Sequence, residues 1–164
     1  EQKNPFFAID VFKCLLKNVP SVEYWWVGNG PLEERVKTYI EEKKLTKYIK
    51  LLGSRNDTVE LYQGMDAFFL PSFFEGLPVT GVEAQAMGLS MIVSDTVTRE
   101  MVYTDLVDYV SLNDTPEAWA SRLEIALRKN VKREQYADRL KLSNFSNIGC
   151  GNRLEQVYCW WING

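Results

Sequence analysis

The sequence contains no histidine, few cysteines and no long apolar run. Without histidine, its 164 residues cannot form a Ser-His-Asp triad, a His-ligated metal site or an imidazole general base. The three cysteines, Cys14, Cys150 and Cys159, are odd in number and lack C-x-x-C spacing, which argues against a zinc site and a disulfide framework. They fit a reducing, cytoplasmic compartment. Cys14 lies among apolar residues and is expected to be a small core residue.

Long apolar segments and excess positive charge are also lacking. No run approaches the roughly 20 residues of a transmembrane helix, and no signal-peptide pattern opens the chain, so a membrane contact would be peripheral, at the inner face. Nineteen Lys and Arg against 22 Asp and Glu give a net charge of −3, without the basic footprint of a nucleic-acid binder. With 46% apolar residues, the chain can form one globular core. Its chemistry must use carboxylates, Lys, Arg, hydroxyls and backbone amides.

Short apolar runs alternate with amphipathic helices along the chain. Asn4 is expected to cap a first helix that begins at Pro5 and is stopped by Pro20. The apolar runs predict strands at 24–27, 49–52, 67–70, 91–94 and 109–112, and the periodicity predicts helices at about 31–44, 58–65, 79–88, 98–104 and 116–129. The run at 67–70 is typical of a strand buried on both faces. The pattern therefore predicts a doubly wound, Rossmann-like α/β fold with a parallel sheet.

The order of elements at the two ends is unusual. A right-handed crossover normally begins with a strand, whereas this chain begins with a helix, so we expect a piece of a longer protein whose first strand is missing. We expect residues 1–144 to form the α/β domain. Residues 145–164, with Tyr158, Trp160 and Trp161, are expected to form a helix that packs on this domain, docks on an absent domain or rests at a membrane interface.

Ligands of open parallel sheets bind beyond the carboxyl ends of the strands, so the loops at that edge are the candidate ligand sites. Gly28-Asn29-Gly30 follows the strand predicted at 24–27. Glu33, however, occupies the third glycine position of the dinucleotide fingerprint, which argues against a full NAD site. This turn is either a tight strand-to-helix connection or a place where a ligand approaches the backbone.

The loop after the third predicted strand carries two carboxylates, Glu75 and Glu83, eight residues apart. A glycine-bearing turn and a helix N-terminus lie between them. Free amides at a helix start attract phosphate, and carboxylates accept hydrogen bonds from sugar hydroxyls. A phosphate between two polyols is the outline of a nucleotide-sugar. Alternatively, Glu83 is a solvated carboxylate that complements the helix dipole.

The segment from Pro71 to Ser90, with Glu75 and Glu83, resembles the E-x7-E motif of the retaining GT-B enzymes of glycosyltransferase family 4. It looks closest to the branch that builds capsular and exopolysaccharides. Further matches extend over most of the chain, at Lys3-Asn4-Pro5, Val27-Gly28-Asn29-Gly30-Pro31, Leu52-Gly53, Val93-Ser94-Asp95 and Trp119-Ala120. The resemblance is to the C-terminal, donor-binding half of a two-domain enzyme.

This resemblance implies transfer of a sugar, of the hexosyltransferase type, from a nucleoside diphosphate to a glycan or lipid-linked acceptor with retention of configuration. It implies no metal, an N-terminal domain of the same protein as partner, and no activity of the isolated fragment. Glu75 would act at the transferred sugar and Glu83 at the ribose. The implied donor-binding residues are Lys3, Gly28, Asn29, Arg55, Glu75, Gly76, Leu77, Val79 and Glu83. The family's first strand would lie between the strands at 24–27 and 67–70.

Several simpler interpretations stay open beside this one. Lys3 and Arg55 could be solvated surface residues, and the arginine that the family pairs with the lysine is absent. The chain could be a non-catalytic nucleotide- or phospholigand-binding module. Two carboxylates in one cleft could also belong to a glycosidase, although neither has an evident apolar environment to raise its pKa. A flavodoxin-like signalling domain would need an acidic cluster, and Asp95 stands alone.

Overall fold

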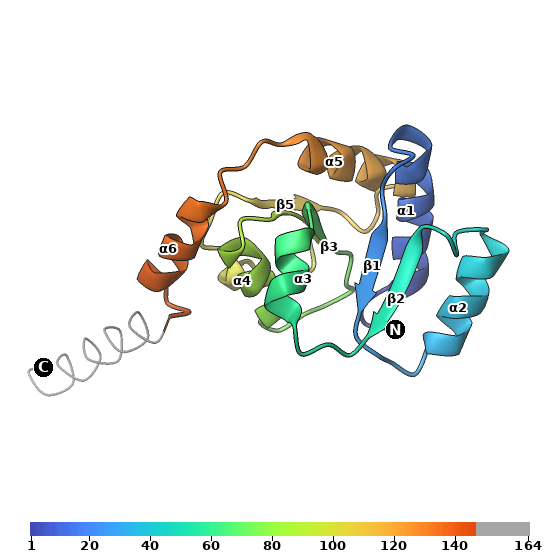
Figure 1. Cartoon of the computed structure of the whole chain (residues 1–164), viewed down its shortest axis with the longest axis horizontal. Helices are drawn as coiled ribbons and strands as arrows, with labels where there is room; N and C mark the ends of the chain where they lie inside the picture. The colour runs from blue at the N-terminus through green and yellow to red at the C-terminus, as the bar shows by residue number, and fades with distance from the viewer. Residues whose placement is uncertain (147–164) are drawn as a thin grey trace, which may run out of the picture.

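The computed structural model describes residues 1–146 and shows an α/β fold (Figure 1). The predicted alternation of strands and helices is confirmed, with small changes at the boundaries. The elements are α1 (Pro5–Asn18), β1 (Tyr24–Val27), α2 (Glu33–Glu42), β2 (Ile49–Gly53), α3 (Thr58–Gly64), β3 (Ala67–Leu70), α4 (Val79–Ala86), β4 (Ser90–Ser94), the 3-10 turn η1 (Arg99–Met101), β5 (Val107–Val110), α5 (Pro116–Arg128) and α6 (Glu134–Leu142).

The strands form two parallel sheets rather than one. β1 pairs with β2, and β3, β4 and β5 form a second sheet with β4 in the centre. All five residues of β4 are buried, as expected for a strand covered on both faces. By contrast, Ala67, Phe68 and Phe69 of β3 are only half-buried, so the expectation that this run is buried on both faces was wrong.

Strand β3 is incompletely buried because a cavity of about 670 Å³ lies between the two sheets, lined by residues of both β1 and β3. These two strands are not hydrogen-bonded neighbours, which confirms the predicted position of the gap. Within residues 1–146 each of them therefore has one edge without a strand partner. Side chains still meet across the gap, since the rings of Tyr24 and Phe69 lie 6.2 Å apart.

One hydrophobic core spans both sheets. Helices α1 and α5 pack against each other, and Trp119 of α5, which is fully buried, contacts Phe7 of α1 and Phe69 of β3 edge-on. Cys14 packs on this core as expected but is only half-buried, with its Sγ 3.4 Å from Oε1 of Glu117. Burial raises the pKa of its thiol, and the hydrogen bond to Glu117 adds to this effect.

Two local predictions were wrong. Asn4 adopts a left-handed conformation at φ 50° and its side chain does not cap α1, although Pro5 does begin the helix. The predicted helix at 98–104 is reduced to η1, because Gln85 binds the backbone of this segment. Strand β5 also begins two residues earlier than predicted.

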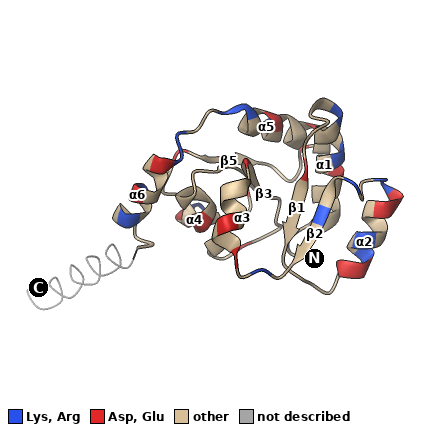
Figure 2. Ribbon diagram, in the orientation of Figure 1, with Lys and Arg blue, Asp and Glu red and all other residues tan. Residues whose placement is uncertain are grey.

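Charged residues of both signs are interspersed along α2 and α6 rather than gathered by sign (Figure 2). Lys37, for example, pairs with both Glu33 and Glu34 on α2. Within the described part of the chain, no helix is both long enough and apolar enough to cross a bilayer. The predictions for Tyr158, Trp160 and Trp161 lie outside the described residues, and the division of the chain at residue 144 stays a prediction.

Candidate functional site

The candidate site lies where β3 and β4 end, in the loop that leads from β3 to α4. Pro71 and Ser72 follow β3 and are buried, while Glu75 forms an isolated parallel bridge with Val97 of the loop after β4. The two loops are thereby joined at the carboxyl edge of the sheet, where open α/β folds bind ligands. The N-terminal residues lie against the same loop, since the Phe73 N–H donates to the Gln2 carbonyl over 2.9 Å.

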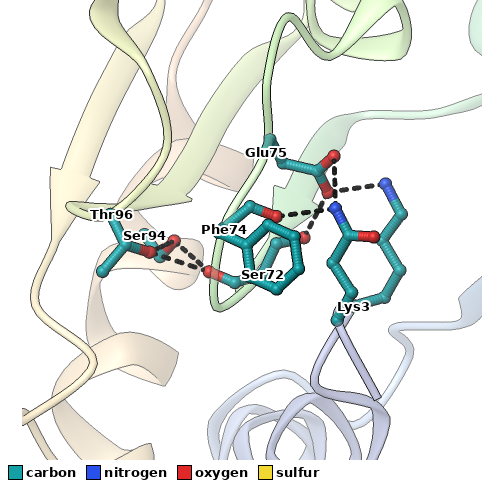
Figure 3. A network of polar contacts seen from close by, with 7 residues as sticks. Lys3, Ser72, Phe74, Glu75, Ser94 and Thr96 are labelled. Carbon is teal, nitrogen blue, oxygen red and sulfur yellow. Dashed lines mark hydrogen bonds and ion pairs between the residues drawn. The ribbon is translucent and has the colours of Figure 1, made fainter.

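Glu75 is surrounded by hydrogen-bond donors (Figure 3). Its Oε1 accepts from Lys3 Nζ at 2.6 Å and from Ser72 Oγ at 2.7 Å, and its Oε2 accepts from Gln2 Nε2 at 3.4 Å. The side chain of Glu75 is only 8% exposed, whereas that of Lys3 is 55% exposed. The structure thus brings together two predicted site residues that are 72 positions apart in the sequence.

Glu83 lies on the second turn of α4 and has a different partner. The hydroxyl of Tyr62, a buried residue of α3, donates to Oε2 of Glu83 over 3.1 Å and lies 3.3 Å from the Thr80 carbonyl oxygen. Burial raises the pKa of Tyr62, and the nearby charge of Glu83 raises it further. Tyr62 therefore stays protonated and acts as a fixed donor to this carboxylate.

Between the two carboxylates, the start of α4 presents backbone amides. Gly76, Leu77 and Val79 are exposed, and no described residue accepts a hydrogen bond from their N–H groups. Pro78, at the N-cap, has no N–H to offer. Free amides at the start of a helix are donors for an anion such as phosphate. The two carboxylates thus lie on either side of these exposed amides in the chain, and phosphate binding at this turn stays a prediction.

Lys3 and Glu83 also line the cavity between the sheets, together with Tyr62 and Thr80. This cavity extends between β1 and β3, so it borders the candidate site at Lys3, Thr80 and Glu83. Its remaining wall is mostly apolar, with Tyr24 and Phe69 among the lining residues.

Gly28, Asn29 and Arg55 form a separate group at the ends of β1 and β2. The Gly28 N–H donates to the Gly53 carbonyl over 2.7 Å, and Gly28 adopts φ 117°, a conformation that favours glycine. Arg55 donates to both carboxylate oxygens of Asp57, over 2.8 and 2.5 Å, and these hydrogen bonds hold the pKa of Asp57 below its usual value. Within residues 1–146, no contact joins this group to Glu75 or Glu83.

Tyr62, Ser72 and Gln2 contact the candidate carboxylates but were not predicted from the sequence. Tyr62 is 21 residues from Glu83, and nothing in the pattern of α3 distinguishes it from a core tyrosine. Ser72, three residues before Glu75, was part of the motif and could have been considered. The described residues bring no three carboxylate or cysteine side chains together in a metal-binding cluster.

The parallel strands and the flanking helices define the fold. They match the C-terminal half of GT-B glycosyltransferases. The pneumococcal O-GlcNAc transferase GtfA, solved with UDP and GlcNAc, superimposes with a TM-score of 0.75 at 15% identity, covering 95% of this chain and 33% of that chain. At this identity the likeness shows the fold alone.

Residues 1–142 match the model of the family described as Glycosyl transferases group 1, and the chain belongs to this family. It is 38% identical over 97 residues to the UDP-Gal:alpha-D-GlcNAc-diphosphoundecaprenol alpha-1,3-galactosyltransferase of Escherichia coli, covering 57% of this chain and 25% of that protein. It is 28% identical over 135 residues to the capsular polysaccharide biosynthesis glycosyltransferase CapH of Staphylococcus aureus, covering 79% of this chain and 38% of that protein. The chain thus spans well under half the length of these relatives.

Proposed function

We propose that this chain binds the nucleotide-sugar donor of a retaining glycosyltransferase. The observation that carries the proposal is the arrangement of Glu75 and Glu83 on either side of the free amides of Gly76, Leu77 and Val79. A nucleoside diphosphate sugar has its anionic diphosphate between two polyols, the ribose and the transferred sugar. The site offers amide donors and acceptor carboxylates in the same order.

Each group has a role that follows from its chemistry. Glu83 accepts hydrogen bonds from the ribose hydroxyls, and Tyr62 keeps its carboxylate oriented. The amides at the start of α4 donate hydrogen bonds to the diphosphate as it leaves, and the Lys3 ammonium offsets part of its charge, so that no metal ion is required. Glu75 accepts from hydroxyls of the transferred sugar close to the bond that breaks, where its interactions strengthen in the transition state. Gly28, Asn29 and Arg55 border the nucleotide from the ends of β1 and β2.

The relatives support a polymer-building role. The Escherichia coli relative is named for galactose transfer from UDP to a diphosphoundecaprenol-linked sugar, and the CapH relative for capsular polysaccharide biosynthesis. We infer a hexosyl donor and a glycan or lipid-linked acceptor at the cytoplasmic side of the membrane. An N-terminal domain of the same enzyme would supply the acceptor side, so the chain alone is expected to bind the donor without transferring the sugar.

Calorimetric titration of the chain with UDP and with UDP-galactose tests the two carboxylates separately. Losing hydrogen bonds to a charged group corresponds to roughly 10- to 150-fold in affinity. Glu83→Gln should weaken the binding of both ligands by this factor, because ribose is common to them. Glu75→Gln should leave UDP binding within a few-fold of the parent, because UDP has no transferred sugar and Glu75 touches the nucleotide only through Lys3. In the protein that also carries the acceptor side, Glu75→Gln should lower kcat.

Two controls sharpen this experiment. Glu60→Gln, on α3, changes a carboxylate that makes no described contact with the site and should bind both ligands as the parent does. Binding should persist in EDTA, and a strict requirement for Mg²⁺ or Mn²⁺ would contradict the proposed donor site. Equal binding of UDP by the parent and by Glu83→Gln would contradict the role of Glu83, and unchanged kcat in Glu75→Gln would favour a non-catalytic nucleotide-binding module.

A further inference from the structure

Ser72 connects the candidate site to the neighbouring strand. It is fully buried, and its hydroxyl donates to Oε1 of Glu75 over 2.7 Å. Its carbonyl oxygen accepts from Ser94 Oγ over 2.5 Å and from Thr96 Oγ1 over 3.0 Å, so that both ends of the residue are engaged (Figure 3). The contacts run from the end of β4, through Ser72, to the carboxylate of Glu75.

The surroundings hold Ser72 rigidly. Ser94 is also fully buried, and its hydroxyl lies 2.8 Å from that of Thr96. Buried hydroxyls are costly unless they are hydrogen-bonded, so a change in the orientation of Ser72 would leave several polar groups without partners. The bridge between Glu75 and Val97 fixes the backbone on the other side.

The three donors to Glu75 differ in how firmly they are held. Lys3 has a side chain that is 55% exposed, so its ammonium is free to turn toward a diphosphate. Gln2 makes its shorter hydrogen bond to the Phe74 carbonyl, at 2.8 Å, and reaches Oε2 of Glu75 only at 3.4 Å. Ser72, by contrast, is fully buried, so its hydroxyl stays within hydrogen-bond distance of Glu75.

We infer that Ser72 is a positioning residue, which holds Oε1 of Glu75 and thereby leaves Oε2 to accept a hydroxyl of the transferred sugar. When Lys3 moves to the diphosphate of the donor, Ser72 keeps the carboxylate in the same orientation. This inference rests on the proposed function, because it assigns the sugar to Glu75. The inference goes further than the proposed function in one respect. The hydroxyls of Ser94 and Thr96, at the end of β4, fix the Ser72 backbone and thereby the orientation of the Glu75 carboxylate.

The test compares Ser72→Ala with Ser90→Ala. Ser90 is a matched control, because it is another buried serine, at the start of β4, whose hydroxyl has no hydrogen-bond partner among the described residues. NMR measurement of the Hα–Hβ couplings of Glu75 should show one χ1 rotamer in the parent and in Ser90→Ala, and averaged rotamers in Ser72→Ala. Ser72→Cys, which keeps a weak S–H donor, should be intermediate.

Ligand binding provides the second measurement. Ser72→Ala should bind UDP as the parent does but should lose about 10-fold of its affinity for UDP-galactose, the loss expected for one hydrogen bond to a charged group. A variant that merely destabilised the loop would lose affinity for both ligands.

The outcomes separate this inference from the proposed function. A single Glu75 rotamer in Ser72→Ala overturns the positioning role, whatever the affinities are. If the parent does not bind UDP, the proposed function fails, and averaged couplings in Ser72→Ala still support the positioning of Glu75 by Ser72. Averaged couplings together with the selective loss of UDP-galactose binding support both.

Discussion

At the residue scale, the two carboxylates of the site are each held by a buried hydroxyl, from the same loop for Glu75 and from α3 for Glu83. Ser72 donates to Glu75 and Tyr62 donates to Glu83. A carboxylate without such a donor would sample several rotamers, and ordering it would reduce the affinity for a ligand. Both hydroxyl donors are uncharged. They orient the carboxylates and leave the positive charge of Lys3 available to a diphosphate.

Tyr62 predicts a dependence of stability on alkaline pH. Because its pKa is raised in the folded protein, the folded state keeps the proton more tightly than the unfolded chain does. The stabilisation is fully present below the unfolded pKa of about 10 and is lost as the pH rises toward the folded pKa. Tyr62→Phe removes this contribution. It should cost about 1–2 kcal/mol at pH 8, where the hydrogen bond to Glu83 is lost.

Urea denaturation of the parent and of Tyr62→Phe at several pH values measures this effect. The difference between their free energies of unfolding should be constant from pH 7 to about 9 and should shrink above about pH 10. A difference that stays constant through pH 11 would mean that the Tyr62 proton is not held more tightly in the folded state. The same variant should weaken UDP binding, because Glu83 loses its donor.

The site could be predicted only where its chemistry is local or belongs to a family pattern. Glu75 and Glu83 share one loop and helix, and their spacing is visible in the sequence. Lys3 was implied by resemblance, and the structure brings it to 2.6 Å from Glu75. The contact between Tyr62 and Glu83 depends on how α3 packs against α4, and periodicity in a single sequence carries no information on such a contact.

At the element scale, a buried polar side chain explains the predicted helix at 98–104 that did not form. Gln85 of α4 is fully buried, and its Nε2 donates to the Met101 carbonyl over 2.9 Å. Its Oε1 accepts from the Tyr103 N–H and from the Thr104 hydroxyl. The bonds to the Met101 carbonyl and the Tyr103 N–H satisfy backbone groups that a helix would otherwise have paired, so the tertiary contact overrides the local preference. The longer helices were predicted well because their apolar stripes face one core.

The end of α4 gives a prediction about stability. Gly88 follows the helix at φ 69°, and a Cβ there would lie 2.8 Å from the Arg133 Cα at the start of α6. Gly88→Ala therefore combines left-handed strain with a clash against backbone, and should lower the free energy of unfolding by about 2–3 kcal/mol. Urea denaturation followed by circular dichroism measures the loss.

Gly30→Ala is the matched control for Gly88→Ala. Gly30 does not have a positive φ, and a Cβ there would meet nothing within 4 Å. This variant should be neutral or stabilise the protein by up to about 1 kcal/mol, since alanine restricts the unfolded chain. Equal effects of the two substitutions would mean that α6 can move away from Gly88 without cost.

At the scale of the whole molecule, two half-sheets are held together by side chains rather than by backbone pairing. The core that joins them includes Ile9 of α1, Ile49 of β2 and Ile92 and Val110 of the second sheet. Because this shared core would be exposed if either sheet separated, we expect the two sheets to unfold together. The cavity between β1 and β3 nevertheless keeps two inner strand edges unpaired, and Lys3 and Glu83 are among its lining residues.

Amide hydrogen exchange should distinguish the unpaired inner edges of β1 and β3 from the fully paired strand β4. β4 is buried along its whole length and pairs with strands on both sides, so its amides should exchange slowest, near the limit of global unfolding. β1 and β3 pair on one edge only, and a cavity of about 670 Å³ has room for water beside the other edge. The amides of β1 and β3 that face the cavity should therefore exchange about 10-fold faster or more than those of β4, because each 1.4 kcal/mol lost from the opening free energy is a factor of ten.

The outer edges of β2 and β5 serve as internal standards for unpaired edges. Cavity-facing amides as slow as those of β4 would show that the two sheets are joined by hydrogen bonds in solution and that the gap between them is closed.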